Sequence, residues 1–152
     1  MTLTQILRLD CVKVPLEGKD KQSVIAELVG LLDAEGLLLD KDAALKAVLA
    51  REQTRSTGIG SGIAIPHGKC GAVKELVMAV GIASEPIDFA SVDGKPVSVI
   101  LLLVSPAEQT GPHIQALARI SKLTLDQKFR DALAHAGSAQ QAYELIRDKE
   151  NE

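Results

Sequence analysis

The sequence predicts an α/β (α+β) fold, a three-layer α/β/α sandwich around a small mixed sheet. Two observations carry this prediction. Five segments have helix signals, and the segments 76–83 and 97–105 are apolar at nearly every position. Strands that are apolar on both faces are typical of a sheet that helices cover on each side. The predicted order is one strand, two helices, further strands and three helices, in a single domain over residues 1–152 with its core at about 10–147.

The helices are predicted from terminal residues and from apolar side chains at helical spacing. Each begins at a residue or pair suited to a helix N-terminus: Asp20, Asp40, Gly111-Pro112, Asp126 and Ser138. The first helix is expected to end at Gly36, the second near Gln53 and the fourth before Gly137, since glycine favours helix C-termini. Four strands are expected, over residues 11–14, 76–83, 89–92 and 97–105, and the third precedes an Asp93-Gly94 turn.

Composition excludes several classes of function. Apolar residues make up 46% of the 152 residues, which is typical of a globular domain, and the net charge is -3. With three aromatic residues and no basic excess, the chain lacks the features of a nucleic-acid-binding protein. The N-terminus has no signal pattern, and the longest apolar run, residues 99–104, is too short for direct membrane insertion. We therefore expect a cytoplasmic protein.

Residues 57–71 differ from the rest of the chain because they hold five of its twelve glycines. No carboxylate occurs between Gln53 and Lys74, whereas Arg55, Lys69 and Lys74 are basic. Exposed N–H groups without competing negative charge are typical of an anion site, although an ordinary surface turn explains the composition equally well. The spacing fits neither a P-loop nor a dinucleotide-binding loop.

Two of the three histidines are candidates for chemistry. His67 lies between Pro66 and Gly68, and an imidazole can act as nucleophile, general base or metal ligand near neutral pH. His113 lies in the first turn of the third helix, where N–H groups attract anions. His135 is interpreted as a helix C-terminal charge. Cys70 beside His67 is a weak alternative as a metal ligand or nucleophile, and we predict no metal and no cofactor.

Five stretches resemble the active-site signature of type-2 IIA domains of the bacterial phosphoenolpyruvate-dependent phosphotransferase system. This is the fructose/mannitol class, which includes the nitrogen-related IIA proteins. The stretches are Arg51-Glu52, residues 56–60, residues 62–68, residues 112–114 and residues 117–121. The resemblance extends from about Asp10 to Ile146, and no signature position departs from the family's pattern.

The resemblance implies a phosphotransferase that forms a phosphohistidine intermediate on Nε2 of His67. An HPr-type phosphocarrier protein would donate the phosphoryl group, and a cysteine of a IIB partner would accept it for sugar uptake. Two alternatives stay open: a nitrogen-related regulatory IIA protein that binds regulatory targets, and a non-covalent anion-binding module.

The same resemblance assigns roles to residues around His67. Arg51 and His113 would act with His67 on the phosphoryl group rather than stabilise the fold. Hydrogen-bond donors to phosphate are expected at Thr57, Gly58, Gly60, Ser61 and Gly68. Glu52 would support the site by orienting Arg51 or a loop amide, and a solvated charge at the helix end is equally compatible with its position.

Overall fold

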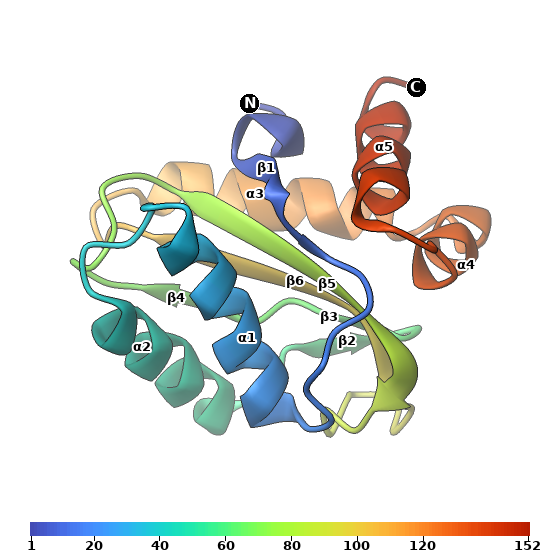
Figure 1. Cartoon of the computed structure of the whole chain (residues 1–152), viewed down its shortest axis with the longest axis horizontal. Coiled ribbons are helices and arrows are strands. Elements are labelled where there is room, and N and C mark those ends of the chain that lie inside the picture. Colours follow the sequence, from blue (N-terminus) through green and yellow to red (C-terminus); the bar gives the residue numbers. More distant parts are fainter.

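The computed structural model describes all 152 residues, with a six-stranded sheet between helices on both sides (Figure 1). The strands are β1 (Leu7–Lys13), β2 (Gly58–Gly60), β3 (Ile63–Ala64), β4 (His67–Lys69), β5 (Val77–Ile87) and β6 (Val97–Ser105). The helices are α1 (Lys21–Ala34), α2 (Lys41–Thr54), α3 (Thr110–Leu123), α4 (Gln127–Ala134) and α5 (Ala139–Glu150), after a 3₁₀ turn, η1 (Leu3–Gln5).

Strand β6 is the strand on which the functional half of the sheet is built. One edge of β6 pairs with β5 in antiparallel orientation. Its other edge pairs in parallel with β3, opposite Val99 and Ile100, and then with β4, opposite Leu103 to Ser105. The sheet is completed by β1, which is parallel to β5, and by β2, which is antiparallel to β3. The mixed α/β class is therefore confirmed.

Local capping explains where most helices begin. Asp20 and Asp40 accept hydrogen bonds from the N–H groups of the third helical residue at 2.8 and 3.1 Å. Asp126 and Ser138 do the same for α4 and α5. These four predicted N-termini are confirmed, because a short polar side chain can satisfy the free N–H groups of a helix start. Helix α3 begins at Thr110 without a side-chain cap.

The helices bury an aliphatic core against the sheet. Helices α1 and α2 lie on one face in Figure 1, with α3 behind the sheet, α5 beside the N-terminal turn and α4 at the right, next to α5. Helix α1 packs against β5 and β1, α2 packs against β4, and α5 packs against β1. One continuous cluster of 42 buried apolar residues joins these layers. None of the helices combines the length and the apolar character that a membrane crossing requires.

One predicted strand is absent, one begins earlier than predicted, and three short strands were not predicted. Residues 89–92 form no strand, because Ala90 has a φ of 52°, which interrupts an extended chain, and Phe89 is buried in the core. The first strand begins at Leu7 rather than at residue 11. Strands β2, β3 and β4 lie within the glycine-rich segment, where the composition hides their strand character.

Candidate active site

His67 begins β4, and its hydrogen bond defines which ring nitrogen is reactive. Its Nδ1 lies 2.7 Å from the backbone carbonyl oxygen of Ile65. A carbonyl can only accept, so Nδ1 carries the proton and the lone pair of the neutral ring lies on Nε2. Burial lowers the pKa of His67, and the nearby charge of Arg51 lowers it further. His67 is therefore a neutral imidazole at pH 7, with a free lone pair on Nε2.

His113 lies beside His67 and comes from the first turn of α3. The two ring centroids are 5.3 Å apart, with an angle of 63° between the ring planes. His113 is only 3% exposed, and its Nδ1 lies 2.7 Å from Oγ of Ser105, the last residue of β6. Burial, together with the charges of His67 and Lys69, lowers the pKa of His113 to about 4. The buried ring of His113 thus also packs inside the protein, and its expected role at the phosphoryl group stays a prediction.

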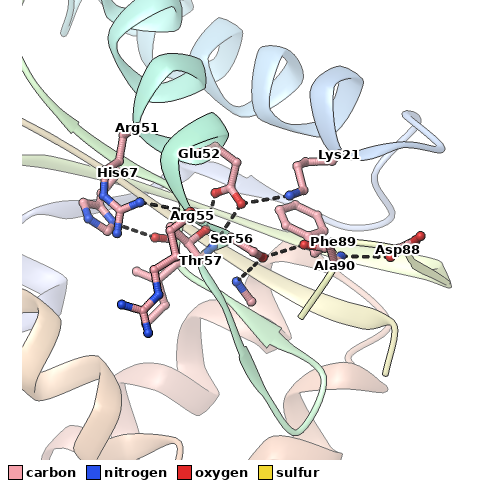
Figure 2. Close-up of polar contacts among 12 residues, drawn as sticks. Lys21, Arg51, Glu52, Arg55, Ser56, Thr57, His67, Asp88, Phe89 and Ala90 are labelled. Atoms are coloured by element: carbon pink, nitrogen blue, oxygen red, sulfur yellow. Dashed lines mark hydrogen bonds and ion pairs between the residues drawn. The ribbon is translucent and has the colours of Figure 1, made fainter. Parts of the chain in front are cut away.

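Arg51 supplies positive charge next to His67. It lies in the last turn of α2, which packs against β4, and Figure 2 shows its side chain beside the imidazole. One guanidinium N–H donates to the carbonyl of Arg55 at 3.0 Å. Arg51 takes part in none of the ion pairs of the chain. Its other N–H groups are therefore available to an anion, and the structure brings together the three predicted residues Arg51, His67 and His113.

Glu52 is buried and holds the chain that leads into β2. Its side chain accepts the N–H of Thr57 at 2.9 Å and the Thr57 hydroxyl, and it pairs with Nζ of Lys21 at 3.0 Å (Figure 2). With 5% exposure, Glu52 is not a solvated charge at the helix end, and it does orient a loop amide. Both donors of Thr57 point to Glu52. This contradicts the expectation that Thr57 directs them to a phosphate.

The hairpin of β2 and β3 lies away from His67. It pairs with β6 at Val99 and Ile100, whereas His67 pairs with Leu103, three or four residues further, or roughly 10–13 Å along the strand. Within the turn, Ser61 has a φ of 59°, and its N–H donates to the Asp93 carboxylate at 3.0 Å. The structure thus does not gather the predicted phosphate donors of this hairpin (Gly58, Gly60 and Ser61) around His67.

Two of the signature glycines lie where a side chain would meet neighbouring atoms at short distance. A β-carbon on Gly58 would lie 2.2 Å from Oγ of Ser91. A β-carbon on Gly68 would lie 3.1 Å from the backbone nitrogen of Val48, where β4 approaches α2. The absence of a side chain at Gly68 therefore allows the strand that carries His67 to lie against α2. This packing accounts for the missing side chain of Gly68, and its expected role in phosphate binding stays a prediction.

The remaining candidate residues from the sequence are Cys70 and His135. No group of three or more His, Cys, Asp or Glu side chains could hold a metal ion, so His67, Cys70 and His113 do not form such a cluster. His135 is exposed, and its Nδ1 lies 2.8 Å from the carbonyl of Asp131 within α4. Sequence reasoning missed Ser105, whose only signal was its position at the end of a predicted strand.

Comparison with known proteins shows the family of the chain. Residues 5–149 match the family described as phosphoenolpyruvate-dependent sugar phosphotransferase system, EIIA 2. The chain is 36% identical over 146 residues to a fructose-specific EIIABC component of Bacillus subtilis; this covers 96% of the chain but only 23% of that longer protein. It is 33% identical to a nitrogen regulatory protein of Escherichia coli, over 99% of the chain and 92% of the relative.

A solved structure has the same fold. The nitrogen regulatory protein IIA-Ntr of Neisseria meningitidis superposes with a TM-score of 0.86 at 32% sequence identity, over 93% of this chain and 97% of that one. The matching region contains the residues of the site, from Arg51 to His113. The chain therefore belongs to the type-2 IIA family of the phosphoenolpyruvate-dependent sugar phosphotransferase system.

Proposed function

We propose that this chain is a phosphocarrier that accepts a phosphoryl group on Nε2 of His67 from an HPr-type protein and passes it to a cysteine of a IIB partner. One observation carries the proposal. The Ile65 carbonyl holds the proton on Nδ1 of His67, so Nε2 has the free lone pair. Membership of the family supports the same assignment, because relatives named as fructose-specific components belong to a sugar phosphotransferase system.

The proposed reaction consists of two displacements at phosphorus. In the first, the lone pair of Nε2 forms a bond to phosphorus, and the bond between phosphorus and the donor's imidazole nitrogen breaks with its electron pair on the donor. In the second, a thiolate of the IIB partner attacks phosphorus, and the bond to Nε2 breaks. The hydrogen bond from Nδ1 to Ile65 favours the partial positive charge of the phosphorylated ring.

Arg51 and His113 would neutralise and orient the transferred group. Phosphoryl transfer needs positioning and charge stabilisation more than covalent help from the protein. The guanidinium of Arg51 offers planar N–H donors that match phosphate oxygens. His113 is held beside His67 with its ring centroid at 5.3 Å, within reach of a group on Nε2.

We further propose that both partners dock on exposed apolar residues next to His113 and on the hairpin of β2 and β3. Among the isoleucines of the signature, Ile59 is 47% exposed, whereas Ile63 and Ile65 are buried and anchor the segment. Ile114, next to His113, is 58% exposed. Transient transfer complexes bury small surfaces, below about 1,200 Å². In an NMR titration with an HPr-type protein, amide signals of residues 57–71 and 111–117 should shift in fast exchange. Shifts confined to α4 and α5 would place docking elsewhere.

Phosphorylation itself is tested with a phosphorylated HPr-type donor. Intact-mass spectrometry should detect one acid-labile phosphate on the wild-type protein and none on His67→Ala. His135→Ala is the matched control, because Nδ1 of this exposed histidine also forms a hydrogen bond with a backbone carbonyl. The variant keeps His67 and should therefore be phosphorylated normally. Phosphorus–nitrogen correlation NMR should assign the bond to Nε2. An unmodified wild-type protein would favour the anion-binding module.

A regulatory role is the second candidate, and the comparison with the nitrogen regulatory proteins favours it. The E. coli protein of that name aligns over 92% of its length, and the Neisseria protein has the same fold at 32% identity. In this case phosphorylation would change partner binding, because a phosphoryl group adds about -1.5 to -2 charges at the docking surface. Rapid transfer to a IIB cysteine would support transport. Retention of the phosphate, with binding of a regulatory target in only one state, would support regulation.

A further inference from the structure

We propose that Ser105 is a positioning residue that holds His113 as the tautomer with its proton on Nε2, so that His113 presents an N–H donor to a phosphoryl group on His67. The inference deepens the proposed function and depends on it for its role in transfer. It starts from the 2.7 Å contact between Oγ of Ser105 and Nδ1 of His113.

Ser105 is fixed on every side. It is fully buried at the end of β6, and its backbone pairs with Lys69 of β4. Its carbonyl accepts the N–H of Cys70 at 3.0 Å, which closes the ladder that carries His67. The backbone that carries the Ser105 hydroxyl is therefore held by the pairing of β6 with β4, the strand that also carries His67. The position of the hydroxyl thus determines where Nδ1 of His113 lies.

The direction of the Ser105–His113 hydrogen bond follows from counting donors and acceptors. His113 Nδ1 is the sole hydrogen-bond partner of the Ser105 hydroxyl in the protein. If Nδ1 carried the proton, the hydroxyl hydrogen would be buried without an acceptor, which folded proteins avoid. If the hydroxyl donates to the Nδ1 lone pair, both groups are satisfied. Burial keeps the pKa of His113 at about 4, so the ring carries a single proton at pH 7, and that proton is on Nε2.

The two histidines consequently have opposite arrangements. His67 has its proton on Nδ1 and its lone pair on Nε2, whereas His113 has its lone pair on Nδ1 and its proton on Nε2. Neither Nε2 atom has a partner in the protein, and neither is sealed from solvent. The nucleophilic nitrogen and the donor therefore belong to rings whose centroids lie 5.3 Å apart. The opposite tautomer of His113 would place a lone pair against the phosphoryl oxygens and repel them.

The proton position can be measured directly in the unphosphorylated protein. Long-range proton–nitrogen NMR spectra distinguish the two neutral tautomers of each histidine. We expect His113 to be protonated on Nε2 in the wild type and to become a mixture of tautomers in Ser105→Ala. Ser105→Thr keeps the hydroxyl and should restore the wild-type spectrum. A wild-type His113 protonated on Nδ1 would overturn the proposal, whether or not any variant folds.

The consequence for transfer is tested with the same proteins. Ser105→Ala should slow phosphorylation of His67 about threefold to tenfold, since it weakens the orientation of a neutral hydrogen-bond donor, and Ser105→Thr should recover most of the rate. Ser91→Ala is the matched control, because Ser91 is a buried serine whose hydroxyl has no partner, and its loss should leave the rate and both tautomers unchanged. An unchanged rate in Ser105→Ala would overturn the positioning role.

Failure of the underlying function gives a different pattern. If no HPr-type donor phosphorylates the wild-type protein, the phosphocarrier proposal fails. The NMR spectra of the unphosphorylated protein would still report whether Ser105 holds the proton of His113 on Nε2. If phosphorylation proceeds normally and the tautomer does not respond to Ser105→Ala, the phosphocarrier proposal stands and the inference about Ser105 fails.

Discussion

Glu52 binds both donors of Thr57, and so it joins the last turn of α2 to the residue that precedes β2. The same carboxylate pairs with Lys21 at the start of α1. One buried charge therefore connects two helices to the signature segment. A charge in this position is stabilising only while its partners stay in place.

Glu52→Ala should reduce the free energy of unfolding by about 2–4 kcal/mol, because it leaves the N–H and hydroxyl of Thr57 without their acceptor and Lys21 without its counter-charge. Chemical denaturation measures the change. Glu75→Ala is the control, since Glu75 is exposed and takes part in no hydrogen bond or ion pair of the chain, and it should change stability by no more than about 0.5 kcal/mol. Equal effects of the two substitutions would contradict the role of Glu52.

Gly68→Ala tests the close approach of β4 to α2. The added methyl group would meet backbone atoms of Ala47 and Val48 at 3.1–3.2 Å, so the strand must move away from the helix. We expect a loss of about 1–3 kcal/mol and slower phosphorylation of the adjacent His67. Gly71→Ala adds the same methyl group where no atom lies within 4 Å, and it should be close to neutral. A neutral Gly68→Ala variant would show that the strand has room to adjust.

Arg51→Ala should slow phosphoryl transfer more than tenfold, a cost of over ~1.4 kcal/mol in the barrier, because it removes the positive charge beside His67. Its melting temperature should change little, since the side chain makes one hydrogen bond, to the Arg55 carbonyl. Stopped-flow or quench-flow transfer assays provide the rate. Arg55→Ala removes an exposed charge nearby and is expected to transfer almost normally. A loss shared equally by both variants would indicate a general charge effect.

Acid should destabilise the protein partly through His113. Its pKa is about 4 in the folded protein, against 6.5 for the ordinary group, so the unfolded chain binds this proton first as the pH falls. The contribution of His113 to the free energy of unfolding is thus fully present above pH 6.5 and is lost between pH 6.5 and about 4, a decrease of up to about 3 kcal/mol. His113→Gln lacks the titrating group, so its stability should fall less over that window. Parallel pH curves for wild type and variant would contradict the assignment.

The sequence predicts the features that depend on neighbouring residues. Asp20 and Asp40 cap the N–H groups of their own helices, so their positions alone located two helix starts. The buried environment of Glu52 was not predictable in this way, because Lys21 lies 31 residues away and comes close only after α1 packs beside α2. Ser105 escaped notice for a similar reason. Its hydroxyl gains a partner only when α3 turns back over the end of β6.

The signature segment illustrates the limit of composition. Its glycines correctly indicated an unusual backbone that packs closely against other atoms, yet they did not identify the neighbouring residues. Gly58 faces Ser91, and Gly68 faces the backbone of α2, so tertiary packing accounts for glycines that the sequence assigned to phosphate. Similarly, the positive φ of Ala90 was invisible in a sequence that favoured a strand over residues 89–92.

Leu103 and Ser105 lie two residues apart on β6; the first pairs with His67, and the second contacts His113. Both imidazoles are therefore positioned by one central strand, β6. The hairpin of β2 and β3 pairs with an earlier part of the same strand, at Val99 and Ile100. The register of His67 and of Ser105 on β6 is therefore set apart from the pairing of the hairpin, and Ile65, the residue after β3, links the hairpin to the ring of His67. For the phosphocarrier proposed above, this arrangement would keep both imidazoles in register on one strand while the exposed hairpin meets partner proteins of different shapes.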